Sequence, residues 1–377
     1  MNKPHAKGTA PAPDLASHAT SAYSPWLHAY ALLFIFATYL LVTIGGNVTS
    51  LGVGLAVPGG WWTFDYFTLW APLSEWWHDM GTRWEHSHRL KGYLVGAMTI
   101  GLAIWLWLSQ PHRPWLQWLG VGLLVLVIVQ GVMGALRVDL ISQFFATVHG
   151  ITGQLFFALT VLVAAATSRI WLQCQHPQPP SNAWSRRSIP PLPTGLKWFA
   201  LALLFMLVVQ LTLGAWMRHN VAGGAIPDFP LNYGHVIPPF TQPELFPGYN
   251  VTQVAVHFAH RVVAYVLIGM ALALLIWLNL RAAGRREIAW PVRWLMLLFA
   301  AQFALGAWTV WSERFPEIAT AHQSLGAIVL AVSTWLTIRI YLLDRTVRAS
   351  ADLPAAPSPP PPAESPQPAP SAKELPA

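Results

Sequence analysis

The sequence predicts an all-α integral membrane protein, with eight transmembrane helices arranged as two tandem four-helix bundles related by a pseudo-twofold axis along the membrane normal. Of the 377 residues, 54% are hydrophobic and only 10% are charged, whereas roughly a quarter are charged in ordinary soluble domains. Eight stretches reach the length of about 20 apolar residues that crosses a bilayer, and motifs of the first half recur in the second. This composition excludes a soluble enzyme, a disordered chain and a nucleic-acid-binding protein.

The predicted helices follow one another along most of the chain. They occupy residues 27–48, 87–109, 114–136, 147–170, 196–217, 255–280, 290–311 and 321–343. The first stretch follows about 25 mostly polar residues and has no small-residue cleavage site, so we expect a retained helix and not a signal peptide.

Three segments lie outside the predicted bundles. Residues 1–26 form an N-terminal segment, residues 175–195 form a linker rich in Pro, Ser and Arg, and residues 344–377 form a tail rich in Pro and Ala. A tail of this composition cannot bury a core, so we expect it to be disordered. The linker separates an N-terminal half, 27–174, from a C-terminal half, 196–343.

Basic residues predict the orientation in the membrane. If both termini face the cytoplasm, the inner segments hold fifteen Lys and Arg residues and the outer loops hold four, Arg83, Arg137, Arg218 and Arg314. Because Lys and Arg gather on the cytoplasmic side, we expect a multi-pass protein of the cell inner membrane with both termini in the cytoplasm. The net charge of +7 then reports topology and not a nucleic-acid-binding patch.

Three motifs recur at a nearly constant spacing. The segment Glu85–Arg89 (EHSHR) is matched by His257–Arg261 (HFAHR). Two further pairs follow in the same order, Gln130-Gly131 with Gln302-Phe303 and His149–Gly153 with His322–Gly326. A repeated unit of four helices enters the membrane in the same sense twice, so its symmetry axis lies along the membrane normal. Any site in one half is therefore expected in the other, at the same depth near the outer face.

Four of the 14 histidines belong to this repeat, namely His88, His149, His260 and His322. Each is predicted within about one turn of the start of a helix that runs inward, so each half has two imidazoles at similar depth. An isolated intramembrane histidine usually forms an interhelical hydrogen bond, but facing side chains in a bundle also build cofactor sites. Zinc needs three or four ligands, whereas haem iron accepts two axial histidines. The pairs therefore predict one haem site in each half.

Polar residues beside the histidines have two interpretations each. Arg89 and Arg261 either neutralise haem propionates or extend to the interface, and Gln130 and Gln302 hydrogen-bond either across helices or to a propionate. The repeated glycines offer flat surfaces to a macrocycle or to another helix; they are Gly131, Gly134, Gly153, Gly306 and Gly326.

The halves differ where Glu85 aligns with His257. Glu85 precedes His88 by three residues and so shares its helical face. The carboxylate is expected either to transfer protons or stabilise a cationic intermediate, at the first site only, or to favour the start of a helix. The asymmetry indicates one catalytic site and a second site that serves it.

At these residues the chain resembles the haem A synthase family. The resemblance covers nearly all of residues 27–343 and rests on Gly45–Ser50, Gly54–Pro58, Glu85–Arg89, Gln130-Gly131, His149-Gly150, Ala222–Pro230, His260-Arg261 and His322 with Gly326. It implies oxidation of one methyl group of haem O to a formyl group through a hydroxymethyl intermediate. It also implies haem O synthase and cytochrome oxidase assembly factors as partners, and it leaves a homo-oligomer open.

The resemblance further implies a role for each site residue. His260 and His322 would be the axial ligands of a bis-His haem B cofactor, supported by Arg261, Gln302 and His257. The substrate haem O would bind near His88, His149 and Arg89, with Glu85 essential for its oxidation.

The chain departs from the family pattern in its first outer loop. It reads Pro58-Gly59-Gly60-Trp61 where many members read Pro-Asp-Trp-Pro, and its single cysteine, Cys174, excludes a cysteine pair in that loop. The Trp-rich segment 59–84 is expected to be an aromatic belt at the membrane interface, with a lid over the first site as the alternative.

Two other functions compete with the enzyme. A non-catalytic di-haem b-type electron carrier would use the same four histidines but would not need Glu85. A transporter also fits a parallel repeat, but the sequence lacks obvious broken helices.

Overall fold

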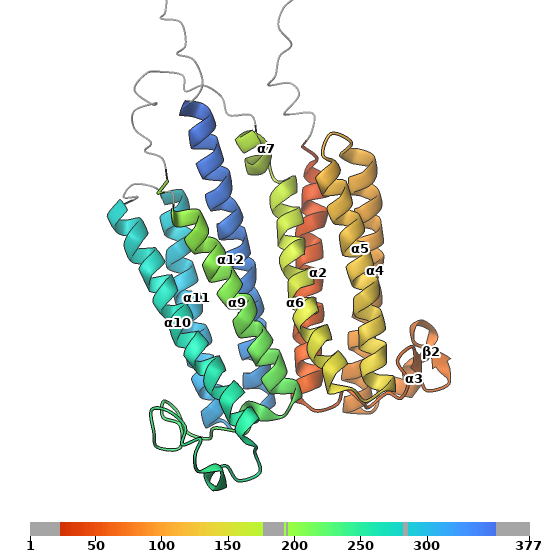
Figure 1. Cartoon of the computed structure of the whole chain (residues 1–377). Coiled ribbons are helices and arrows are strands. Elements are labelled where there is room, and N and C mark those ends of the chain that lie inside the picture. The colour runs from red at the N-terminus through yellow and green to blue at the C-terminus, as the bar shows by residue number, and fades with distance from the viewer. Residues whose placement is uncertain (1–22, 176–191, 194, 282–285, 352–377) are drawn as a thin grey trace, which may run out of the picture.

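The computed structural model describes residues 23–175, 192–193, 195–281 and 286–351, and it contains two groups of four long helices side by side (Figure 1). The first group comprises α2 (Pro25–Ser50), α4 (Met80–Ser109), α5 (Pro114–Asp139) and α6 (Gln143–Thr167). The second comprises α9 (Gly195–His219), α10 (Val251–Arg281), α11 (Arg286–Trp311) and α12 (Pro316–Ala351). All eight are long and apolar enough to cross a membrane. The predicted all-α membrane fold is therefore confirmed, whereas the pseudo-twofold axis stays a prediction.

Shorter elements lie mainly in two long loops, residues 51–79 and 220–250. The first loop holds a small antiparallel pair of strands, and the second holds two short 3-10 helices. Both loops lie at one end of the bundle, here called the loop end, opposite to the start of α2 (Figure 1). The elements are β1 (Trp62–Thr63), β2 (Tyr66–Phe67), η1 (Thr68–Trp70), α3 (Leu73–Trp76), α7 (Arg169–Gln175), η2 (Ala222–Gly224) and η3 (Pro243–Leu245).

Several helices begin earlier than hydropathy predicts. Helix α4 begins at Met80, where the Asp79 carboxylate accepts a hydrogen bond from the Thr82 N–H at 2.7 Å, and α12 begins at Pro316, a residue suited to a first helical position. The apolar runs start later than these caps. The four repeated histidines therefore lie about two turns inside their helices, and the prediction that they lie within about one turn of the start is wrong.

The last helix also ends later than predicted. Helix α12 continues to Ala351, so residues 344–351 are helical and not part of a disordered tail. Asp344 accepts a hydrogen bond from Lys197 Nζ at 2.9 Å and thereby ties α12 to α9. The rest of that tail, the N-terminal residues 1–22 and residues 176–191 of the linker lie outside the described residues.

Each half has its own apolar core. In the first half, buried side chains that include Leu27, Phe34, Leu102, Leu123 and Phe156 form one cluster. A second cluster belongs to the other half and includes Leu196, Leu203, Leu274, Leu295 and Ile340. Many other apolar side chains point outward, as expected where lipid is the solvent.

The two halves meet through helices α2, α6, α9 and α12. Polar side chains connect them near the loop end, since the guanidinium of Arg218 on α9 donates hydrogen bonds to the Gly46 carbonyl and to Ser50 Oγ on α2. It also donates to Gln323 Oε1 on α12 at 3.2 Å. Thr320 Oγ1 on α12 reaches the same Ser50 Oγ at 2.8 Å. Arg218 thus joins two helices of the second half to one of the first.

Candidate functional site

One cavity of about 1500 Å³ extends through both halves, and all four repeated histidines line it. His88 and His149 come from α4 and α6, and His260 and His322 come from the corresponding helices α10 and α12. The structure therefore brings together the residues that the repeat singled out. Both pairs open on the same space inside the membrane-spanning region.

The first pair has a separation suited to a shared metal. The ring centroids of His88 and His149 are 6.5 Å apart, and the ring planes are at 87°. Two metal–nitrogen bonds of about 2 Å each, with roughly 1 Å from each nitrogen to its ring centre, would give about 6 Å. Within the described residues, Nδ1 of His149 lies 3.1 Å from the Gln130 carbonyl and Nδ1 of His88 has no hydrogen-bond partner. This donor pair fits an iron with two axial imidazoles.

In the second pair, one nitrogen already has a protein partner. Gln210 Nε2 on α9 lies 3.1 Å from Nε2 of His260, whereas the first half has Leu41 lining the cavity near the corresponding place. His322 Nε2 has no hydrogen bond among the described residues. Gln210 would have to turn aside before His260 could ligate a metal through Nε2.

A glycine of the preceding long helix makes room for each imidazole. A Cβ atom at Gly45 would lie 2.7 Å from His88 Cε1, and one at Gly214 would lie 3.1 Å from His260 Cε1. The same holds at Gly134, 3.4 Å from His149 Cε1, and at Gly306, 3.0 Å from His322 Cε1. The sequence predicted that Gly134 and Gly306 would contact a macrocycle or another helix, but in the structure they contact the histidine rings.

The two glutamines bond across helices, which was one of their two predicted roles. Gln130 Nε2 on α5 donates to Thr152 Oγ1 on α6, and Gln302 Nε2 on α11 donates to the His322 carbonyl on α12 at 2.9 Å. The Gln130 carbonyl also lies 3.1 Å from Nδ1 of His149. This bond fixes the ring and leaves Nε2 free to face the cavity.

Glu85 holds the first of the two long loops. Its side chain is buried; Oε2 accepts a hydrogen bond from the Val57 N–H at 2.9 Å, and Oε1 lies 2.7 Å from Nη2 of Arg89. Arg89 in turn donates to the carbonyls of Val57, Gly59 and Trp62 at 2.7–2.9 Å. Arg89 and Glu85 together therefore fasten the segment 57–62 to α4.

The second half fastens its loop in the same way with a different side chain. Nδ1 of His257 accepts a hydrogen bond from the Ile226 N–H at 3.2 Å. Arg261 donates to the carbonyls of Ile226, Asp228 and Leu231 at 2.8–3.1 Å. Sequence reasoning missed this role of both arginines, because the residues that accept their hydrogen bonds are distant in the chain.

Asp228 stabilises the turn that follows this anchor. Its carboxylate accepts hydrogen bonds from the backbone N–H groups of Tyr233 at 2.7 Å and Gly234 at 2.9 Å. Partial burial alone would raise the pKa of Asp228, but these donors and the nearby Arg261 guanidinium outweigh it and lower that pKa below its usual range. The turn therefore favours the ionised carboxylate.

The cavity carries more positive than negative charge. Five arginines line it, Arg89, Arg137, Arg218, Arg261 and Arg314, against two carboxylates, Glu85 and Glu313. Arg137 uses one donor on the Gly54 carbonyl at 3.1 Å, and the guanidinium of Arg314 donates to no group among the described residues. Arg314 lies against the second loop, where a Cβ at Gly224 would be 3.0 Å from its Cζ. These cations favour a ligand that carries carboxylates.

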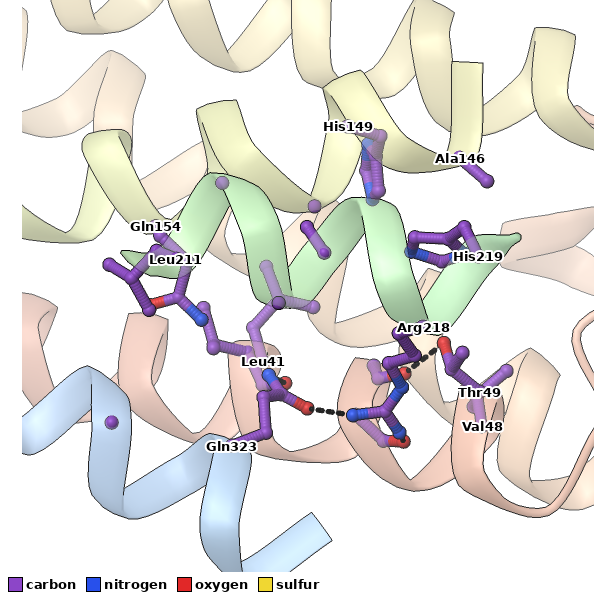
Figure 2. Close-up of a pocket in the computed structure, with 18 of the residues that line it drawn as sticks. Leu41, Val48, Thr49, Ala146, His149, Gln154, Leu211, Arg218, His219 and Gln323 are labelled. Carbon is purple, nitrogen blue, oxygen red and sulfur yellow. Dashed lines mark hydrogen bonds between the residues drawn. The ribbon is translucent and has the colours of Figure 1, made fainter. Parts of the chain in front are cut away.

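Figure 2 shows the part of the cavity between the two halves. Arg218 points from α9 toward Gln323 and toward the α2 segment that contains Val48 and Thr49, while His219 lies beside it on the side of His149. A Cβ at Gly150 would lie 3.5 Å from His219 Nε2, so α9 and α6 approach closely here. The sequence assigned Arg218 to an outer loop, but it lies between the halves.

The Trp-rich first loop has features of both predicted roles. Trp61 lines the cavity, and a Cβ at Gly131 would lie 3.6 Å from its ring. Trp70 and Trp77 are largely exposed. His86 stacks on Trp76 with ring centroids 4.3 Å apart, and its Nδ1 lies 2.9 Å from Thr63 Oγ1. His86 thus holds this loop in shape.

Fold and site together define a polytopic membrane protein with two intramembrane histidine pairs on one cavity. The sequence model of the COX15-CtaA family, described as cytochrome oxidase assembly protein, matches residues 28–334, and the chain belongs to that family. The resemblance recognised in the sequence is thereby confirmed.

Several curated relatives match most of the chain. A protein named heme A synthase from Alkalihalophilus pseudofirmus is 26% identical, over 83% of this chain and 97% of its own length. The heme A synthase of Beijerinckia indica is 28% identical over 86% of this chain and 96% of its own length. That of Symbiobacterium thermophilum is 29% identical over 74% and 84%.

Proposed function

We propose that the protein is a haem A synthase that oxidises one methyl group of haem O to a formyl group through a hydroxymethyl intermediate. The relatives named heme A synthase support the reaction class. The observation that carries the assignment to this chain is the pair of histidine sites on one cavity, of which the first has Glu85 one helical turn before its histidine and the second has His257 at that position. Two haem sites that differ at this position suit a catalytic site and a cofactor site.

The first half is the proposed substrate site, and the second half is the proposed cofactor site. Haem O would be held by His88 and His149, and haem B would take His260 and His322 as axial ligands. A haem bound in the second half supplies one-electron redox chemistry. The 6.5 Å separation of the first imidazole pair and the glycine behind each ring support this assignment.

Arginines on the cavity wall would bind the carboxylates of both ligands. Arg137 lies in the first half, and Arg314 lies beside the second loop. Both have donors that no described residue uses, whereas Arg89 and Arg261 are engaged with loop carbonyls. Arg261, Gln302 and His257 would support the cofactor site by fixing its loop and the helix that carries His322.

Glu85 is the proposed proton acceptor for the substrate. Its carboxylate lines the cavity about one helical turn from His88. The carboxylate lies 2.7 Å from the Arg89 guanidinium and would accept the proton at Oε1 or Oε2. The loop that Glu85 and Arg89 fasten would help to keep water from the first site.

The proposed location is the cell inner membrane, with both termini in the cytoplasm and the loop end outside. The excess of Lys and Arg in the inner segments supports this orientation. The haem sites would then lie near the outer face. Haem O synthase would supply the substrate, and factors that assemble cytochrome oxidase would receive the product.

Expression in a host that makes haem O but no haem A tests the function. We expect extracts of the cells to contain haem A or its hydroxymethyl precursor, and an empty-vector culture to contain neither. A folded, haem-loaded protein that yields neither product would overturn the proposal.

A second candidate is a di-haem electron carrier, and one observation favours it. Glu85 accepts the same loop hydrogen bond as His257, so its presence could reflect anchoring alone. Replacement of Glu85 by Gln, which can still accept from Val57, separates the two functions. A carrier should keep its haem content and its redox activity, whereas the synthase should keep its haem B and lose its product.

A further inference from the structure

The cavity extends further along the first half than along the second. On α4 and α5 its wall reaches Ile100 and Leu124, whereas on α10 and α11 the wall ends at Ile268 and Phe299. The residues of the second half that correspond to Ile100 and Leu124 in the repeat, Leu272 and Met296, do not line it. The extra space is a groove between α4 and α5.

Three glycines of the first half correspond to larger residues in the second half. Gly92, Gly96 and Gly131 line the groove; in the repeat they correspond to Ala264, Ile268 and Phe303. A Cβ atom at Gly92 or Gly96 would meet no atom within 4 Å, so both glycines border open space.

In the second half an aromatic cluster fills the corresponding position. The ring of Phe303 lies 5.6 Å from that of Tyr265 and 5.7 Å from that of Phe229. In the first half, Tyr93, which corresponds to Tyr265, instead contacts Phe67 of the outer loop at 5.9 Å. The two histidine sites are therefore alike at the ligands and differ in the space beside them.

Helix packing does not account for the glycines of the groove. Small residues at this spacing usually let two helices approach closely, but here no neighbouring helix comes within 4 Å of a Cβ at Gly92 or Gly96. The rim of the groove is apolar and exposed, with Leu94 at 55%, Ile100 at 49% and Ile128 at 58%. The groove thus opens from the first site toward the lipid.

We propose that this groove holds the isoprenoid chain of the substrate, and that Ile268 and Phe303 exclude such a chain from the second site. The inference rests on the proposed function and deepens it, since haem O differs from haem B by a long hydroxyethylfarnesyl substituent. From Gly92 to Ile100 the groove follows α4 for about 12 Å. It can hold much of the chain and pass the remainder into the bilayer.

The second site discriminates against haem O because its filled wall excludes the isoprenoid chain; the groove of the first site adds little affinity for that chain. Lipid is as apolar as the groove, so moving the chain from one to the other gains little. A filled wall, by contrast, admits the chain only with strain or displacement of side chains. Two sites with the same ligands can in this way sort a tailed haem from a tail-less one.

Substitutions that copy one half into the other test the proposal. G96I and G131F introduce the residues of the second half into the groove, and G122I places the same added bulk on the lipid-facing side of α5, outside the cavity wall. Each purified protein is loaded with haem O and with haem B, and the bound haems are extracted and separated. We expect G96I and G131F to lower the ratio of bound haem O to bound haem B by about tenfold or more, and G122I to leave it unchanged.

The reverse variant guards against loss of folding. I268G/F303G opens the second wall, and we expect it to bind a second equivalent of haem O. Unchanged haem O binding in both G96I and G131F, or a change in oligomeric state that accounts for the loss, would overturn the groove proposal. If wild type selects haem O and the variants do not, but no variant or wild type makes product, the proposed function fails while the groove stands.

Discussion

Each half fastens the long loop after its first helix through a backbone N–H, which donates to a carboxylate in the first half and to an imidazole in the second. Glu85 accepts from the Val57 N–H where His257 accepts from the Ile226 N–H, and Arg89 and Arg261 bind loop carbonyls in both. A neutral imidazole is therefore sufficient for the anchor. A carboxylate is therefore not needed to fix the loop, which leaves Glu85 for the reaction that we propose.

The largest expected effect comes from breaking one histidine pair at a time. We expect H322A to lose the haem of the second half and all product. H88A should keep that haem while its product falls below detection, because the substrate site alone is damaged. Absorbance spectra with haem extraction measure both. If H88A and H322A lose the same haem, the halves do not hold separate sites.

The next largest effect is expected when Glu85 is replaced by histidine, the residue at the corresponding position of the second half. E85H can still accept from Val57 but has no carboxylate, so we expect loss of turnover of about 10²-fold or more, the usual range for a proton-transferring group. Haem content should stay at the wild-type level. The reciprocal variant H257E serves as the control and should retain turnover within a few-fold. Full activity in E85H would show that Glu85 only fixes the loop and takes no part in the reaction.

A smaller effect is expected from the arginines with unused donors. Replacing Arg314 by Gln should release haem from the second site about 10–100-fold faster, because a charge-assisted hydrogen bond contributes roughly 1.5–3 kcal/mol. R137Q should act on the first site instead. Transfer of haem to an excess of apomyoglobin gives the rates, with R83Q in the first turn of α4, outside the cavity wall, as the control. Equal effects of both variants on both sites would contradict the assignment.

The smallest effect concerns the turn at Asp228. The pKa of Asp228 is lower in the folded protein than in the unfolded chain, so the ionised carboxylate stabilises the fold at neutral pH. This stabilisation begins to fall when the pH drops below the pKa of the unfolded chain, and it is lost once the pH is below the lower pKa of the folded state. Since the group is mostly solvated, D228N should cost less than about 1 kcal/mol. The difference in Tm between wild type and D228N should therefore shrink toward zero on acidification. A difference that is independent of pH would exclude the carboxylate as its cause.

The sequence predicted the helices well because burial in lipid depends on local composition. Eight apolar runs became eight long helices. Their ends were less accurate, since the Asp79 cap and Pro316 extend α4 and α12 beyond the apolar runs. The apolar count cannot register such caps, which depend on a few polar contacts.

The four histidines on the cavity were predictable because the repeat contains two histidine positions and each of them occurs in both halves. Their surroundings were not, because the contacts join residues that are distant in the chain. Arg218 reaches Gly46 and Ser50 across the two halves, and Arg89 reaches carbonyls of a loop. Nor could spacing reveal that Gly45 and Gly214 make room for imidazole rings.

The position of Arg218 has a consequence for biogenesis. Its acceptors Gly46 and Ser50 belong to α2, which leaves the ribosome long before α9. Without these partners the guanidinium would keep Gln323 as its acceptor, and an incompletely paired charge within a bilayer costs several kcal/mol. The N-terminal half thus supplies two acceptors that the later half needs, and we expect a C-terminal half synthesised by itself to be degraded faster by membrane proteases than the full chain.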